Sequence, residues 1–200
     1  MATLAELTQE VISRGYDYES TANIESSIQR HHQRLEARYV WPWREGTKEG
    51  VAPFEIKDLR GVLSVENTTA ENIIYGQSRQ WLAERYPDLE ESGSPVWWWL
   101  DNLTLRVFPT STTENISVRY AKKPEKLTTS KEPAMPSEWQ YLIVDLAVAD
   151  ALKNNDEYQA ARELKEDVQA DLQQMVAAEL KRDLQSNPLI VRTGPIGTYL

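Results

Sequence analysis

Cysteine is absent from the 200-residue sequence, and histidine occurs only twice. The absence of cysteine excludes disulfides, thiolate metal sites and cysteine nucleophiles together. The two histidines are neighbours, His31 and His32. Consecutive residues of a helix point about 100° apart, so the two rings cannot readily face one metal ion. We therefore predict that this pair lies on the protein surface and binds no metal.

The sequence also lacks a long apolar run and an excess of basic residues. No stretch approaches the roughly 18–20 apolar residues that span a bilayer, so no membrane association is expected. Glu6 and Glu10 stand where a signal peptide would need a basic end and an apolar centre, which predicts that the protein does not use the general export route. The formal net charge of −9 argues against nucleic-acid binding by the whole surface, because phosphates require clustered Lys and Arg.

No pattern typical of an active site occurs. There is no Gly-rich phosphate loop, no paired His/carboxylate metal motif and no nucleophile elbow. Four carboxylates form an acidic strip on the last predicted helix: Glu163, Glu166, Asp167 and Asp171. This strip is either a solvated helix face or the wall of a DNA passage, where repulsion of phosphate would let a duplex slide. We predict a protein that is not an enzyme, with no catalytic residues, metal or cofactor.

Apolar residues at helical spacing predict an amphipathic helical hairpin at the start of the chain. Thr3 and Glu6 form a capping box for the first helix. Ser20 or Thr21 caps the second helix. That helix is expected to end before Pro42, because the residue that precedes a proline disfavours α geometry.

From Gly46 the sequence changes to short β-forming runs separated by turn residues. The clearest region predicts a β-meander with strands at residues 97–99, 103–108 and 116–121. Two shorter strands at 54–56 and 62–66 and one or two helical turns at 78–86 precede it. We therefore predict a small antiparallel β-rich insertion between helices.

Two further helices follow a linker that contains three prolines. Ser137 is expected to cap the first of them. Only Asp145 and Asp150 carry charge over residues 139–151, which predicts a helix buried on nearly every side. The second helix runs from about 157 to 184. Its predicted apolar stripe consists of Tyr158, Ala161, Leu164, Val168, Leu172 and Met175.

The last residues combine helix-breaking and apolar side chains. Two prolines and two glycines between 188 and 197 exclude a regular helix. The apolar residues are Leu189, Ile190, Val191, Ile196, Tyr199 and Leu200. A disordered tail is usually more polar, so we predict an extended segment that adds a strand to a partner or fills a groove on it. Folding back onto the chain's own core is the alternative.

Arginines and tryptophans near the end of the hairpin are the candidate interface residues. Arg30, Arg34 and Arg38 recur every four residues and so share one face of the second helix. That face could meet phosphate, an acidic partner or the carboxylates of a neighbouring subunit. Trp41 and Trp43 could stack on bases, but tryptophan is more typical of cores and interfaces. We predict a subunit interface that includes these three arginines and two tryptophans.

The order of these parts resembles that of the head-to-tail adaptor (connector) proteins of tailed bacteriophages, including the gatekeeper-type proteins of short-tailed phages. The resemblance covers most of the chain and depends on a few degenerate segments. They are YVWPW at 39–43, SPVWWW at 94–99 with LRVFP at 105–109, and MPSEWQYLIV at 135–144. A long helix and an extended tail follow the last of them.

For an adaptor, the resemblance implies a homo-oligomeric ring of about twelve copies below the portal vertex, closed by heterologous contacts. The C-terminal segment would engage the portal protein, and a downstream neck or tail protein would follow. DNA would pass through the centre without sequence-specific binding. The protein would lie in the virion neck between capsid and tail, and in the host cytoplasm during assembly.

The predicted fold class is α+β. Residues 1–45 and 125–185 form a helical body, 46–124 the β-rich insertion and 186–200 the docking tail. Two other functions remain open. A different ring, tail-completion or tail-tube component of a virion would be expected to be richer in β-structure and to lack two long C-terminal helices. A soluble protein with an unrecognised small-molecule site would be expected to show convergent His, Cys or Gly-rich motifs.

Overall fold

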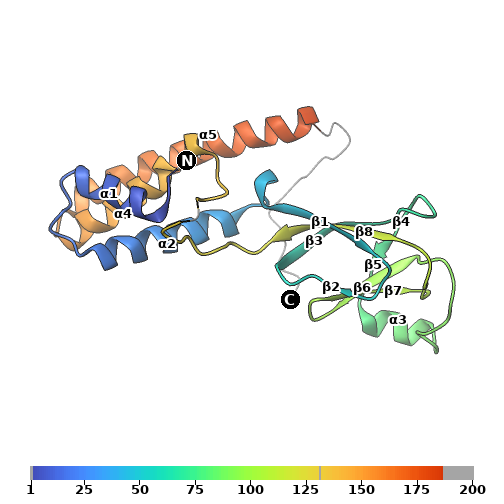
Figure 1. The fold of residues 1–200 in the computed structure, drawn as a ribbon. Coiled ribbons are helices and arrows are strands. Elements are labelled where there is room, and N and C mark those ends of the chain that lie inside the picture. Colours follow the sequence, from blue (N-terminus) through green and yellow to red (C-terminus); the bar gives the residue numbers. More distant parts are fainter. Residues whose placement is uncertain (1, 131, 187–200) are drawn as a thin grey trace. The chain divides into compact units, whose positions relative to one another are not determined.

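The structure, a computed structural model, describes residues 2–130 and 132–186. It has an α+β fold, which confirms the predicted class. The chain divides into two compact units (Figure 1). The helical unit comprises the described residues up to Trp43 and from Pro124 onward, and the β unit is Arg44–Lys123. The predicted docking tail lies outside the described residues, except for Ser186, which ends the last helix.

The helical unit, within the described residues, contains four α-helices and a short 3-10 helix. They are α1 Leu4–Ser13, α2 Thr21–Arg38, α4 Tyr141–Asn154, α5 Tyr158–Ser186 and the 3-10 helix η2 Ser137–Trp139. A further 3-10 helix, η1 Pro42–Arg44, follows α2. The predicted caps of the hairpin are confirmed. Thr3 and Glu6 form the capping box of α1, and the Ser20 hydroxyl accepts the Asn23 N–H at 3.2 Å.

Helix α4 is the central helix of this unit and packs against α1, α2 and α5. Leu142, Ile143 and Val144 are consecutive and fully buried. Because successive residues point about 100° apart, their burial means that neighbours cover α4 from several directions. The prediction of a helix buried on nearly every side, made from its lack of charge, is confirmed.

Two details of the C-terminal helices differ from the prediction. Ser137 does not cap α4, because the 3-10 turn η2 precedes it and the Gln140 N–H donates to the Ser137 carbonyl instead. Tyr158 is not part of the apolar stripe of α5. Its side chain is 59% exposed, and its hydroxyl donates to Asp156 at 2.9 Å. The rest of the predicted stripe is buried or half-buried in the helical core.

The β unit contains eight strands and a short helix among its residues. They are β1 Glu45–Gly50, β2 Phe54–Glu55, β3 Leu59–Asn67, β4 Asn72–Ile73, β5 Tyr75–Gly76, α3 Arg79–Arg85, β6 Trp97–Asp101, β7 Thr104–Phe108 and β8 Ile116–Lys122. One sheet has the order β1-β8-β3-β4 and the other β2-β7-β6-β5. Apolar side chains of both sheets, such as Val65 and Val118 of the first and Leu105 and Val107 of the second, form one shared core.

The predicted β-meander is wrong in its third strand. β6 and β7 form an antiparallel hairpin in which Trp97 pairs with Phe108. β8 instead pairs with β1 and β3 in the other sheet. Alternation shows only that one face of a strand is apolar, so the pattern cannot distinguish a strand beside β7 from one that faces it across the core. β1 was not predicted, because its sequence, EGTKEG, has no apolar residue to alternate.

One short segment ends both sheets at the same side of the β unit. β4 pairs with β3 in the first sheet, and β5 pairs with β6 in the second. The buried Ile74 lies between them and donates its N–H to the Val65 carbonyl at 3.0 Å. The β5–β6 pair is parallel, with Tyr75 opposite Trp97, which corrects the prediction of a wholly antiparallel insertion.

The three consecutive tryptophans of β6 are explained by a strand that is covered on both faces. Trp98 packs into the core shared by the two sheets. Trp97 and Trp99 point the other way and pack with Leu82 of α3 and with Phe108. Side chains alternate between the faces of a strand. An unbroken aromatic run therefore fits a strand with α3 over one face and a second sheet over the other.

Candidate functional site

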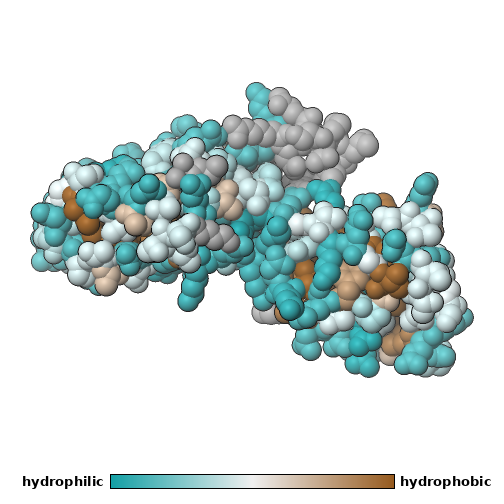
Figure 2. Space-filling view, in the orientation of Figure 1, coloured by the Kyte–Doolittle hydropathy of each residue, from teal (hydrophilic) through white to brown (hydrophobic). Residues whose placement is uncertain are grey.

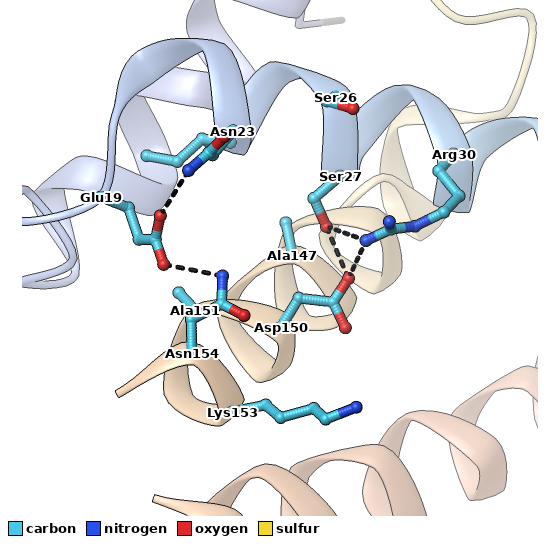
Figure 3. A pocket seen from close by; sticks show the side chains of 11 residues that line it. Glu19, Asn23, Ser26, Ser27, Arg30, Ala147, Asp150, Ala151, Lys153 and Asn154 are labelled. Atoms are coloured by element: carbon cyan, nitrogen blue, oxygen red, sulfur yellow. Dashed lines mark hydrogen bonds and ion pairs between the residues drawn. The ribbon is translucent and has the colours of Figure 1, made fainter. Parts of the chain in front are cut away.

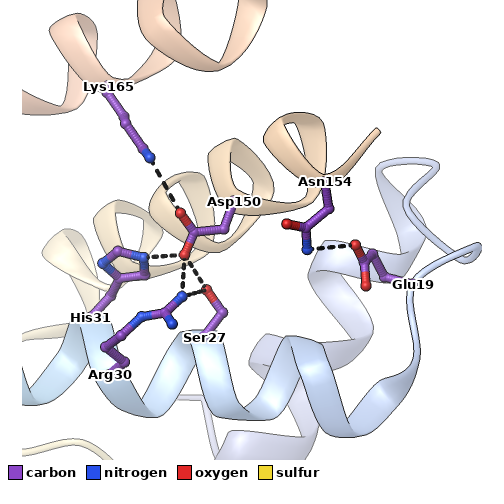
Figure 4. A network of polar contacts seen from close by, with 7 residues as sticks. All are labelled: Glu19, Ser27, Arg30, His31, Asp150, Asn154 and Lys165. Carbon is purple, nitrogen blue, oxygen red and sulfur yellow. Dashed lines mark hydrogen bonds and ion pairs between the residues drawn. The ribbon is translucent and has the colours of Figure 1, made fainter. Parts of the chain in front are cut away.

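Asp150 of α4 gathers donors from two other helices (Figure 4). Its Oδ2 accepts the Ser27 hydroxyl at 2.7 Å and the Arg30 guanidinium at 2.5 Å. The His31 Nε2 lies 2.7 Å from the same oxygen. On the other side Lys165 of α5 reaches Oδ1 at 3.2 Å. This Asp150 cluster ties α2, α4 and α5 together.

The positions of the donors follow from helix geometry. Ser27, Arg30 and His31 stand at i, i+3 and i+4 on α2, so they share the face that meets α4. The predicted surface position of the histidines is wrong, since His31 is 8% and His32 1% exposed. His32 Nε2 lies 3.4 Å from Glu36 Oε1, in a second buried contact. Both histidines flank the apolar stripe of α2, and a pattern that counts only apolar residues misses polar ones beside it.

The environment of Asp150 keeps it ionised. Burial alone would raise its pKa, but the bonds from His31, Ser27 and Arg30 together outweigh burial and hold the pKa of Asp150 well below its ordinary value. A general acid or base at neutral pH needs a pKa near the working pH. Asp150 is therefore suited to clamping helices and unsuited to proton transfer.

Acid should weaken this clamp. The pKa of Asp150 is lower in the folded than in the unfolded chain, so its contribution to stability is present above about pH 4, the unfolded value, and is lost as the pH falls further. Chemical unfolding of the wild type and of Asp150→Asn between pH 7 and 2.5 measures this. We expect the stability difference between the two proteins to shrink below about pH 4. A difference that stays constant down to pH 2.5 would contradict the low pKa of Asp150.

A hollow of about 340 Å³ opens beside the Asp150 cluster, between α2 and α4 (Figure 3). Its polar groups largely satisfy one another. Asn23 and Asn154 both donate to the Glu19 carboxylate, at 3.2 and 2.8 Å. Small-molecule sites are mostly apolar with a few convergent polar groups. This hollow has the opposite character, so it does not favour the small-molecule alternative. In the described part of the chain no group of three or more His, Asp or Glu is arranged to hold a metal ion.

The predicted interface residues of α2 differ in their surroundings. Arg30 is engaged by Asp150. Arg34 and Arg38 are exposed, and neither contacts a carboxylate of the described residues. Arg38 lies over the Tyr39 ring, with its guanidinium carbon 5.6 Å from the ring centroid.

The two predicted interface tryptophans pack against the chain's own core. Trp41 is 2% exposed, and its indole N–H donates to the Leu35 carbonyl at 2.9 Å. Trp43 is half-buried and stacks on Trp41, with ring centroids 4.8 Å apart and planes 10° apart. The subunit interface formed by the arginines and tryptophans stays a prediction.

The acidic strip of α5 is not uniform. Glu166 pairs with Arg162 at 2.9 Å, and Asp171 accepts the Tyr141 hydroxyl at 3.0 Å. Glu163 accepts only the neutral amide of Gln159. Asp167 is exposed and contacts no cation of the described residues. Within the described residues only Glu166 of the strip is paired with a cation, and Glu163 and Asp167 are its two exposed members without one.

A row of aromatic side chains on the β unit was not predicted from sequence. Tyr75, 58% exposed, lies 6.0 Å from Trp97, and Trp97 lies 5.2 Å from Trp81 of α3, between ring centroids. Arg85 covers the Trp81 ring at 4.1 Å. Figure 2 shows further hydrophobic surface over this unit, where five of the seven exposed large apolar side chains of the described residues lie. The pairing of β5 with β6 brings Tyr75 to Trp97, and the packing of α3 on β6 brings Trp81 to Trp97.

The helices of the described residues include none that is long and apolar enough to cross a membrane. No curated protein matches the chain. The family model for SU10 adaptor protein matches residues 2–192, nearly the whole length. Adaptors of this kind are structural components of phage particles that bind other particle proteins and do not catalyse reactions. The chain therefore belongs to the SU10 adaptor protein family, a family of phage head-to-tail adaptors.

Proposed function

We propose that this protein is a head-to-tail connector: about twelve copies form a ring under the portal, extend the DNA channel and join the capsid to the tail. The family match over residues 2–192 is the observation that carries the proposal. The two C-terminal helices α4 and α5 favour a connector over a tail-tube component, which would be richer in β-structure. The place of the protein is then the virion neck.

The portal contact is assigned to the segment that follows α5. Its apolar residues are Leu189, Ile190, Val191, Ile196, Tyr199 and Leu200. Burial of these side chains on a partner, together with main-chain hydrogen bonds to it, is the favourable contribution that would hold this segment in place. A downstream neck or tail protein binds elsewhere on the ring. DNA passes without sequence-specific binding, in keeping with the net charge of −9.

Deleting residues 187–200 tests this function. We expect attachment to the portal protein of the same phage to be abolished, while the chemical unfolding curve of the free protein stays nearly unchanged. Binding is measured by co-sedimentation of the purified protein with portal rings. A matched control is the double variant Arg192→Ala/Thr193→Ala, which changes polar positions of the same segment and should still attach. Normal attachment of the truncated chain, or a large loss of its stability, would refute the docking role.

A further inference from the structure

We propose that neighbouring copies join through charge rows on their helical units: Arg34 and Arg38 on α2 of one copy contact Glu163 and Asp167 on α5 of the next. The inference depends on the proposed ring and names its contact. It assigns the part of α2 that carries Arg34 and Arg38 to a second copy of this chain. The acidic residues of α5 thereby become an interface element in place of a solvated face or a DNA-facing wall.

The basic row is identified by comparison with the other arginines of the helical unit. Arg14, Arg30 and Arg162 each contact a carboxylate of the same chain. Arg34 and Arg38 are exposed and contact no carboxylate of the described residues. They stand four residues apart, so both project from one side of α2. Among the described arginines of this unit, Arg34 and Arg38 are therefore the two without a carboxylate partner in the described residues.

The acidic row likewise consists of exposed charges that have no oppositely charged partner in the described residues. Glu163 and Asp167 are also four residues apart on one side of α5, where like charges repel each other. The nearest cations in sequence are directed elsewhere. Arg162 pairs with Glu166, and Lys165 reaches Asp150. An external pair of cations would remove this repulsion.

The two rows fit each other in spacing and in placement. Residues four apart on a helix rise about 6 Å, so Arg34 and Arg38 match Glu163 and Asp167 two for two. α2 and α5 each pack on α4. Lys165, which turns toward the α4 side, stands two residues, or about 200°, from both Glu163 and Asp167. The acidic row thus lies on the flank of α5 away from that side. Two different patches, one on α2 and one on α5, form a head-to-tail contact, the type from which closed rings are built.

Charge reversal of each row provides the test. Arg34→Glu/Arg38→Glu should lose self-association on the order of 10- to 100-fold, because acidic rows then face each other. Glu163→Arg/Asp167→Arg should lose it equally, through two basic rows. An equimolar mixture of the two variants should assemble again as an alternating ring, since every contact then joins opposite charges. Native mass spectrometry with and without portal rings reads out the copy number.

The matched control is Arg162→Glu/Glu166→Arg, which exchanges an exposed ion pair of α5 and should assemble like the wild type. Either charge-reversed variant assembling normally, or the mixture remaining monomeric, would overturn the contact while leaving the ring intact. A wild type that stays monomeric with portal rings would refute the proposed ring, and the contact with it. If the arginine variant instead lost salt-sensitive binding to duplex DNA and was not rescued by the mixture, the α2 row would be a phosphate surface.

Discussion

Replacing Trp99 with alanine should destabilise the β unit by about 3–5 kcal/mol, the largest effect that we expect from one substitution in this unit. Trp99 is buried and packs with Leu82 of α3 and Phe108 of β7. Truncation leaves a cavity that α3 cannot fill without leaving the sheet. Chemical unfolding followed by circular dichroism measures the loss.

Two further variants separate packing from other causes. Trp97→Ala changes the same residue type two positions away on the same face, but Trp97 is only half-buried. We expect it to cost about 1–2 kcal/mol, from its contacts with Tyr75 and Trp81. Trp99→Phe keeps most of the ring and removes an indole N–H that has no acceptor in the described residues, so it should cost less than about 1.5 kcal/mol. Equal losses for Trp97→Ala and Trp99→Ala would contradict a strand with α3 over Trp99.

Replacing Asp150 with alanine should lower the stability of the helical unit by about 2–4 kcal/mol at neutral pH. The loss comes mainly from the buried donors. The His31 side chain is only 10% exposed, and Ser27 is buried, so water cannot replace the hydrogen bond that each of them loses. Arg30 and Lys165 are nearly half exposed and can be solvated again. Thermal and chemical unfolding at pH 7 give the difference.

Asp145→Ala is the matched control for Asp150, because it removes the same carboxylate from the same helix. Asp145 contacts Arg14, which keeps a second partner in Glu10 at 2.8 Å. The expected loss is therefore only about 0–1 kcal/mol. If the two alanine variants were equally stable, Asp150 would be an ordinary surface carboxylate and not the junction of three helices.

The helices could be predicted from the sequence because their determinants are local. Thr3 with Glu6 and Ser20 lie within three residues of the N–H groups that they cap, and α4 reveals its burial through its own lack of charge. The sheets could not be predicted as well, because pairing is decided between distant segments. β8 pairs with β1, more than sixty residues away, through the backbone of a strand without apolar side chains.

The Asp150 cluster was beyond sequence analysis for the same reason. In the sequence Asp150 is only one of two charges on a predicted buried helix, and its partners on α2 lie about 120 residues away in the chain. Nothing near His31 in the sequence indicates which carboxylate it meets, and the exclusion of a shared metal ion left a surface position as the prediction for both histidines. The aromatic row on the β unit has the same origin, since Trp81 and Trp97 meet only through the docking of α3.

The short edge strands of the β unit affect the tendency of the protein to aggregate through its sheets. Three of the four outermost strands, β2, β4 and β5, are only two residues long, and the fourth, β1, carries Glu45, Lys48 and Glu49. A two-residue edge strand offers very few backbone hydrogen bonds to a strand of another molecule. The charged side chains of β1 disfavour such pairing along the longer edge. The sheet edges of the described residues therefore offer little backbone for strand addition between copies of the chain. In the proposed ring, the choice of the correct neighbour then depends on side chains, and salt screens the attraction between their charges.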